Sequence, residues 1–208
     1  AAGNDTTYAY DAAGNMIGMM DARGNPSSYE YDARDRLVRT VDAQGNTTKF
    51  VYDTEGNLLS VTDPLGHISR HRYDARNRRI ETIDPDGGRT QFRYDFDDNL
   101  ISLIDPVGNR TLFDYDLRNR LVREIDPLGN VIQYEYDGAD NLVQKTDRIG
   151  RVTQYQYDAL NRLTKETWVG DTSGLGDAPN VIQYAYDLAN NLTSTHDAFS
   201  SLAYTYDA

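Results

Sequence analysis

The sequence predicts an all-β protein built from tandem repeats, and three observations support this prediction. A Tyr-Asp pair recurs along the chain, and its first eight copies are spaced 21 residues apart. Between the pairs, short runs of alternating apolar and polar residues are bounded by Asp, Gly, Asn and Pro, which is typical of strands joined by tight turns. Only 38% of the residues are hydrophobic, and Tyr (16) outnumbers Phe (5) and Trp (1). We expect each unit to bury its faces against its neighbours instead of forming a private core.

The ten Tyr-Asp pairs are the predicted structural repeat residues. The ninth pair follows the eighth after 29 residues, and the tenth comes 20 residues later. We interpret the pairs as structural positions of the repeat and not as an active site. They are Tyr10, Asp11, Tyr31, Asp32, Tyr52, Asp53, Tyr73, Asp74, Tyr94, Asp95, Tyr115, Asp116, Tyr136, Asp137, Tyr157, Asp158, Tyr186, Asp187, Tyr206 and Asp207.

The first strand of each unit ends in the repeated Tyr. In the stretch 48–52, Thr48, Phe50 and Tyr52 alternate with two residues that face the other way, which is the two-residue period of a strand. An aromatic residue precedes the repeated Tyr by two positions in every unit except one, where His71 replaces it. We expect these rings to pack against neighbouring strands while the Tyr hydroxyls face water.

Two tight turns complete each unit. After Tyr52, the loop Asp53–Asn57 has Asp at its start and Gly at a position suited to a left-handed conformation. A second apolar run then leads to Asp63-Pro64-Leu65-Gly66, which matches the residue preferences of a type I turn. Two strands of ~6 residues and two loops of ~4 fill each unit.

Ten such units predict a long antiparallel meander of about 20 strands, roughly 95 Å along the strip at ~4.8 Å per strand. Open sheets of this size coil, because strands twist, and barrels of about 16–18 strands already enclose a water-filled lumen. We therefore expect a single-layer sheet that curls into a hollow, barrel-like spiral shell. The domain prediction is one array over residues 1–208, a fragment of a longer repeat region, with an irregular loop insertion at 168–179.

Composition excludes several classes of function. The net charge is −12, which makes nucleic acid an unexpected partner because phosphate binding requires clustered Lys and Arg. The chain has no Cys and no apolar run of the roughly 20 residues needed to span a membrane. Its first residues lack the charged start and apolar stretch of a signal peptide.

These motifs, Tyr-Asp-x-x-Asn/Gly-Arg/Asn-Leu followed by Asp-Pro-x-Gly-Asn, resemble the YD repeats of the rearrangement-hotspot (RHS) proteins over essentially the whole chain. That family includes bacterial polymorphic toxins, the B and C subunits of insecticidal toxin complexes, wall-associated proteins and the animal teneurins. The resemblance implies a β-sheet strip that spirals into a hollow cocoon. In the bacterial toxins the cocoon encloses a C-terminal toxic domain, and the sequence is more similar to this bacterial group. The resemblance also implies a secreted protein that uses a specialised bacterial delivery system.

Two segments resemble catalytic motifs. In the bacterial toxins an autoproteolytic site lies beyond the repeats and carries paired Asp-Pro-x-Gly-Leu motifs. Here the segments 63–66 and 126–129 are followed by His67 and Asn130 and fall in phase with the repeat, so we interpret both as turns. Asp171-Thr172-Ser173-Gly174 resembles an aspartic-protease motif with an inserted Ser and has no second copy. We predict that the chain is not an enzyme.

No cofactor or metal site is predicted either. The Asp-rich turns lack the nine-residue calcium repeat and the acidic loop of an EF-hand. The three His residues, His67, His71 and His196, do not have zinc-ligand spacing. The glycosylation acceptor motifs at Asn46, Asn109 and Asn191 are of a kind that occurs often by chance.

The leading functional hypothesis is a structural shell segment that encapsulates a toxin polypeptide. Its expected partners are further YD repeats of the parent chain and the enclosed toxin domain, and its outermost strands present open edges suited to self-association. The alternative is an extracellular binding or adhesion module that recognises a glycan or a cell-surface receptor. In that case recognition would use the outward polar positions Lys49, Arg70, Arg72, Arg93, Glu135 and Gln156.

Overall fold

The computed structural model describes residues 5–169 and 180–207. The fold is all-β, a 19-stranded antiparallel meander of hairpins, which confirms the predicted fold class. The curling of this meander into a hollow shell stays a prediction. The chain divides into two compact units, one formed by residues 1–93 with 104–109 and the other by residues 94–103 with 110–208.

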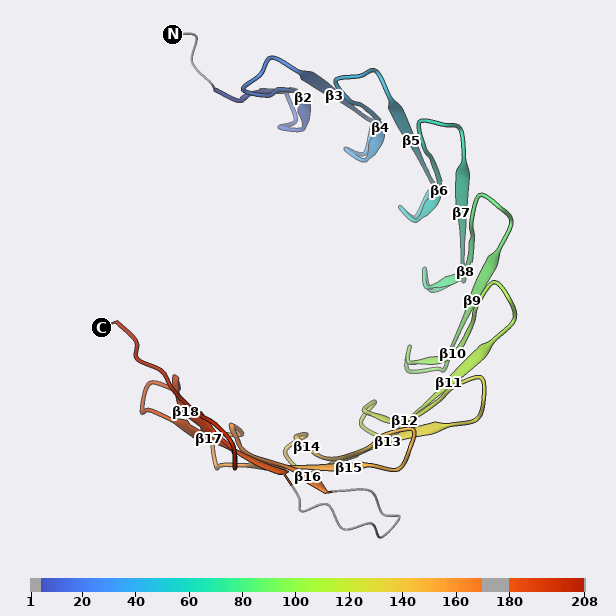
Figure 1. Ribbon diagram of the computed structural model, residues 1–208. Helices are drawn as coiled ribbons and strands as arrows, with labels where there is room; N and C mark the ends of the chain where they lie inside the picture. Colours follow the sequence, from blue (N-terminus) through green and yellow to red (C-terminus); the bar gives the residue numbers. More distant parts are fainter. Residues whose placement is uncertain (1–4, 170–179, 208) are drawn as a thin grey trace. The chain divides into compact units, whose positions relative to one another are not determined.

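In the first unit, each strand pairs with the next one along the chain (Figure 1). Its strands are β1 (Thr7–Tyr10), β2 (Met16–Met20), β3 (Pro26–Tyr31), β4 (Leu37–Val41), β5 (Thr47–Tyr52), β6 (Leu58–Thr62), β7 (Ile68–Tyr73), β8 (Arg79–Ile83) and β9 (Arg89–Tyr94).

The second unit has the same organisation, and β11 to β19 pair in chain order. Its strands are β10 (Leu100–Ile104), β11 (Arg110–Tyr115), β12 (Leu121–Ile125), β13 (Val131–Tyr136), β14 (Leu142–Thr146), β15 (Val152–Tyr157), β16 (Leu163–Val169), β17 (Asn180–Tyr186), β18 (Leu192–His196) and β19 (Ser201–Ala203).

Both kinds of turn have one geometry. The backbone N–H of Asp116 donates to the carbonyl of Arg120 (3.0 Å), and the N–H of Asn119 donates back to the carbonyl of Asp116 (3.0 Å). Asn119 has a φ of 60°, so the loop is a type I turn followed by a left-handed residue. The Asp126 turn repeats the same two bonds, with Gly129 at a φ of 84°. The predicted left-handed positions are therefore confirmed.

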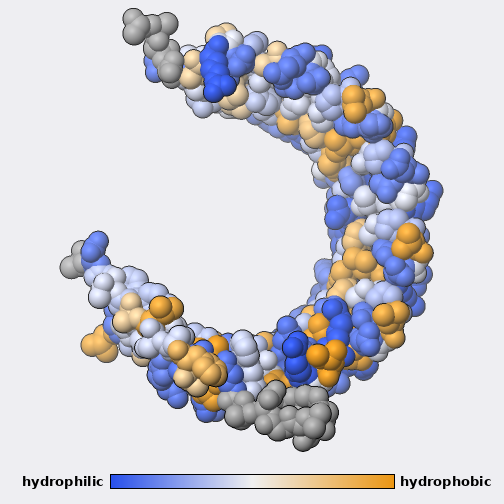
Figure 2. All heavy atoms as spheres, viewed as in Figure 1, coloured by the Kyte–Doolittle hydropathy of each residue, from blue (hydrophilic) through white to orange (hydrophobic). Residues whose placement is uncertain are grey.

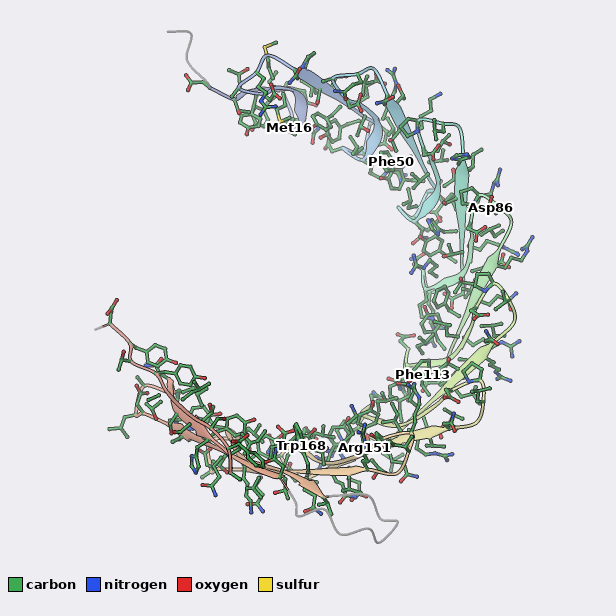
Figure 3. The ribbon with its side chains drawn as sticks, viewed as in Figure 1. Met16, Phe50, Asp86, Phe113, Arg151 and Trp168 are labelled. Atoms are coloured by element: carbon green, nitrogen blue, oxygen red, sulfur yellow. The ribbon has the colours of Figure 1, made fainter. Side chains whose placement is uncertain are left out.

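The sheet is a single layer. Along β5, Phe50 and Tyr52 are half-buried while Lys49 and Val51 are exposed, which confirms the predicted alternation. Among the described residues no hydrophobic side chain is fully buried. Figure 2 accordingly shows hydrophobic residues in small groups among hydrophilic ones. In the first unit, Phe50 lies on one side of the strands and Asp86, in a turn, on the other (Figure 3).

One boundary of the predicted insertion was wrong. Residues 168–179 were expected to form an irregular loop, but Trp168 and Val169 continue strand β16, where they pair with Thr153 and Val152. Trp168 occupies the position at which the other units have the Asp that opens the next turn, so the strand runs on past its usual end. The remainder, 170–179, lies outside the described residues.

A pair of glycines tests the backbone geometry of the turns. Gly129 has a positive φ and Gly138 does not, and a Cβ added at either one would meet no atom within 4 Å. We expect Gly129→Ala to lower the free energy of unfolding by roughly 1–2 kcal/mol, because an L-residue is strained there. Gly138→Ala should be neutral, or stabilising by up to about 1 kcal/mol, because it restricts the unfolded chain. Urea unfolding measures both, and equal effects would contradict the assigned geometry.

Candidate functional site

The carboxylate of each Tyr-Asp turn is used within its own turn. Oδ1 of Asp116 accepts hydrogen bonds from the backbone N–H groups of Arg118 (2.8 Å) and Arg120 (3.1 Å). Oδ2 accepts from Nε of Arg120 (2.7 Å). Oδ1 likewise accepts from the backbone, and Oδ2 from the side chain four residues on, at Asp11, Asp32, Asp53, Asp74, Asp95, Asp137, Asp158 and Asp187.

These bonds favour the ionised carboxylate. The side-chain hydrogen bond from Arg120, with the backbone donors of the turn, lowers the pKa of Asp116 to about 2. The bond from Arg36 lowers the pKa of Asp32 to about 2 in the same way. Where the donor is a neutral amide, as at Asp137 with Asn141, the pKa is again below its ordinary value. The carboxylates are therefore suited to hold turns and not to exchange protons near neutral pH.

The repeated Tyr connects its own unit to the preceding one. The hydroxyl of Tyr136 donates to the backbone carbonyl of Leu121 (2.9 Å), the first residue of β12. The hydroxyl of Tyr157 donates to Leu142 at the start of β14 (3.0 Å). The same bond joins Tyr31 to Met16, Tyr73 to Leu58, Tyr115 to Leu100, Tyr186 to Leu163 and Tyr206 to Leu192. For these seven tyrosines the expectation that the hydroxyl faces water was wrong, because each hydroxyl reaches a carbonyl beside the preceding turn.

The position four residues after the Asp alternates between two residue types. Its donor side chain is an amide in one repeat and a guanidinium in the next, so the chemical period is two repeats long. The residues are Asn15, Arg36, Asn57, Arg78, Asn99, Arg120, Asn141, Arg162 and Asn191. This alternation is a signal in the sequence alone from which the donor positions could have been predicted.

Both residue types also donate to the next Tyr-Asp turn. Nδ2 of Asn99 donates to the side-chain oxygen of Asn119 (2.9 Å). Nη1 of Arg120 donates to the backbone carbonyl of Asp137 (3.0 Å) and to Oδ1 of Asp140 (2.8 Å). The guanidinium of Arg120 also lies 4.7 Å from the ring centroid of Tyr136, within cation–π range. Within each unit, the turns thus form a chain of contacts in which one turn holds the next.

Little of the described structure supports chemistry at these positions. Its residues contain no group of three or more His, Cys, Asp or Glu that could hold a metal ion. His67 contacts the carboxylate of Asp63 (2.8 Å), which is the role that Asn has in the equivalent turns. His71 contacts the hydroxyl of Thr82, and its pKa is lowered by burial and by Arg79.

The segments that resemble catalytic motifs are ordinary repeat turns where the structure describes them. The segments at Asp63 and Asp126 are turns closed by backbone hydrogen bonds from Gly66 (3.0 Å) and Gly129 (2.9 Å), as predicted. Asp171–Gly174 lies outside the described residues.

No helix in the described part of the chain is long and apolar enough to cross a membrane.

The row of Tyr-Asp turns agrees with a known protein family. The family model described as the teneurin YD-shell matches residues 9–169. The chain belongs to the teneurin YD-shell family. Among curated proteins, no sequence relative matches this YD-shell chain.

Solved structures agree with the family at the level of the fold. A TcdB2-TccC3-TEV crystal structure has a TM-score of 0.68 and 18% identity, and the match covers 93% of this YD-shell chain and 13% of that one. TcdB2-TccC3 without its hypervariable C-terminal region has a TM-score of 0.60 and 18% identity, and the match covers 97% of this chain and 13% of that one. The Tc holotoxin pore of Photorhabdus luminescens has a TM-score of 0.56 and 15% identity, and the match covers 91% of this chain and 13% of that one. The YD-shell chain therefore spans about one eighth of the length of these structures.

The pKa of Asp116 tests the role of its arginine partner. A carboxyl whose pKa is depressed stabilises the fold above its unfolded value, and this stabilisation is lost as the pH falls through the folded value. We expect Asp116 to titrate at about 2 by carboxyl-carbon NMR and to move back toward 3.8 in Arg120→Gln. Acid should therefore weaken the wild-type turn between about pH 4 and pH 2. The matched control is Arg123→Gln, because Arg123 pairs with Asp114 and not with Asp116. Titration near 3.8 in all three proteins would contradict the assignment.

Proposed function

We propose that this chain is a non-catalytic wall segment of an RHS-type shell that encapsulates a toxin polypeptide. The observation that carries the proposal is the use of the Tyr-Asp pairs. Tyr hydroxyls bond backward to the preceding repeat, as Tyr136 does with Leu121, and turn side chains bond forward, as Arg120 does with Asp137. A pair whose polar atoms are occupied in this way extends a wall and leaves no free nucleophile or base.

The burial pattern also supports a wall. Single-layer repeats are stabilised by contacts between neighbours, and among the described residues no hydrophobic side chain is fully buried. The half-buried aromatic face, with Phe50 and Tyr52 as examples, is only partly covered by its own strand neighbours. Such a face is suited to contact a further polypeptide. On this proposal the ten Tyr-Asp pairs are structural positions and residues 1–208 are one array, with an insertion in the sequence after Val169.

The proposed partners follow from the small share of the related structures' length that this chain covers. Because it covers 13% of the TcdB2-TccC3 chain, we propose that further YD repeats of the same parent chain complete the shell. The enclosed partner would be a toxic domain of that parent, and the protein would be secreted through a specialised bacterial delivery system.

Electron cryomicroscopy of the complete protein that contains this chain tests the proposal. We expect a closed β-shell with density for a separate polypeptide inside it, and we expect that polypeptide to resist added protease until the shell is denatured. A solid interior, or a sheet that stays open with no enclosed chain, would contradict the proposed function.

A second candidate function is favoured by a different observation. The face opposite the aromatic rings carries exposed cations, among them Lys49, Arg70, Arg72 and Arg93. Other outward positions carry exposed acids, such as Glu30 and Glu135, so the positive charge is confined to part of this face. A local group of exposed cations is suited to an extracellular binding module, which could coexist with a shell.

A further inference from the structure

Four arginines gather on one face of the first unit, opposite the aromatic side chains. Arg70 and Arg72 alternate with His71 along β7, and Arg89 and Arg93 stand on β9. All four are exposed. Because successive residues of a strand face opposite sides, each pair points away from the half-buried rings. We call these four residues the arginine face.

One acidic side chain lies between the two strands. Glu81, on β8, pairs in register with Arg72 on one side and Gln91 on the other. It is only 6% exposed, and its carboxylate accepts from Arg89 (3.0 Å) and Arg72 (3.4 Å). A buried carboxylate requires such partners, because leaving it unpaired is costly. Glu81 therefore holds two guanidiniums in place, and its single charge offsets only one of the four positive charges.

The other two guanidiniums are available to a partner. Within the described residues, neither Arg70 nor Arg93 has an ion-pair or hydrogen-bond partner at its side chain. The turn between β8 and β9 carries Asp84 and Asp86, which bound the arginine face at one end. The result is a local positive surface on a chain whose net charge is −12. Its attraction acts at short range, since salt screens exposed charges over about 8–10 Å.

The spacing of the arginines fits an extended peptide. Alternate residues along a strand are roughly 6.6–6.8 Å apart, and β7 and β9, separated by β8, are roughly 9.6 Å apart. A peptide in extended conformation places its own alternate side chains at the same interval of roughly 6.6–6.8 Å. Acidic residues at every second position would therefore meet Arg70 and Arg72 along β7, or Arg89 and Arg93 along β9 with Gln91 between them. The planar fork of Arg binds a carboxylate through two parallel bonds.

Two other macromolecules fit less well. Single-stranded nucleic acid is held by aromatic stacking platforms as well as by charge, and β9 presents only Arg89, Gln91 and Arg93 on this face. A folded protein partner would call for a buried apolar anchor at the centre of the contact, where the structure has Glu81. We propose that the arginine face binds an acidic polypeptide segment in extended conformation. This deepens the second candidate function and is independent of whether the shell encloses a toxin.

Fluorescence anisotropy with the 208-residue chain tests the proposal. The probe is a labelled peptide of four Glu-Ser repeats, compared with a Lys-Ser peptide and with a peptide that has the same composition but its four Glu in one block. We expect the alternating acidic peptide to bind most tightly, and its affinity to fall as salt is raised. Arg70→Gln/Arg93→Gln should weaken binding by about tenfold, because two charge-assisted contacts are lost.

Arg39→Gln/Arg123→Gln is the matched control, because it removes the same charge from arginines that are already paired with Glu30 and Asp114. It should leave the affinity unchanged. All the substituted side chains are partly or fully exposed, and a circular dichroism spectrum and urea unfolding curve equal to wild type confirm that each variant folds. No binding at millimolar peptide, equal losses in the two double variants, or tighter binding of heparin or of a 12-nucleotide DNA would overturn the proposal.

Discussion

The structure depends on the hydrogen bond by which a tyrosine hydroxyl reaches the backbone carbonyl of the preceding repeat. The carbonyl of Leu121 stands at the first position of its strand, and Tyr136 supplies the donor. A carbonyl without such a partner would remain unsatisfied beside a half-buried ring, at a cost comparable to a lost hydrogen bond. Tyr is suited to this position because its ring covers the neighbouring strand while its hydroxyl satisfies the carbonyl.

The side chains of the Tyr-Asp turns connect each repeat to the following one, in the opposite direction to the tyrosine hydrogen bond. Asp116 fixes its own turn, and Arg120, held by that carboxylate, reaches the carbonyl of Asp137 in the next turn. Contacts therefore run backward through Tyr and forward through Arg or Asn, always between adjacent repeats. Such an arrangement explains how a chain can be ordered without a fully buried apolar core, since its stability is a sum of similar nearest-neighbour terms. It also explains why the Tyr-Asp turns of the described residues repeat the same side-chain chemistry along this chain.

Much of this could be predicted from the sequence. Two-residue periodicity at Phe50 and Tyr52, and Gly or Asn at left-handed positions such as Gly129 and Asn119, are local signals, so strands and turns followed from them. The hydroxyl partner of Tyr136 could not be predicted, because it lies in another repeat and depends on register. Trp168 was misplaced because an insertion hides where a strand ends. The alternation of Asn and Arg after the Asp was present in the sequence but has meaning only when adjacent turns are known to touch.

Replacement of one hydroxyl tests the central claim most directly. Tyr136→Phe keeps the ring and removes the donor to Leu121, whereas Tyr134→Phe, in the same strand, removes a hydroxyl that makes no hydrogen bond to the described residues. Urea unfolding should show a loss of about 0.5–1.5 kcal/mol for Tyr136→Phe and almost none for Tyr134→Phe. Equal unfolding free energies for the two variants would contradict the view that this bond connects the repeats.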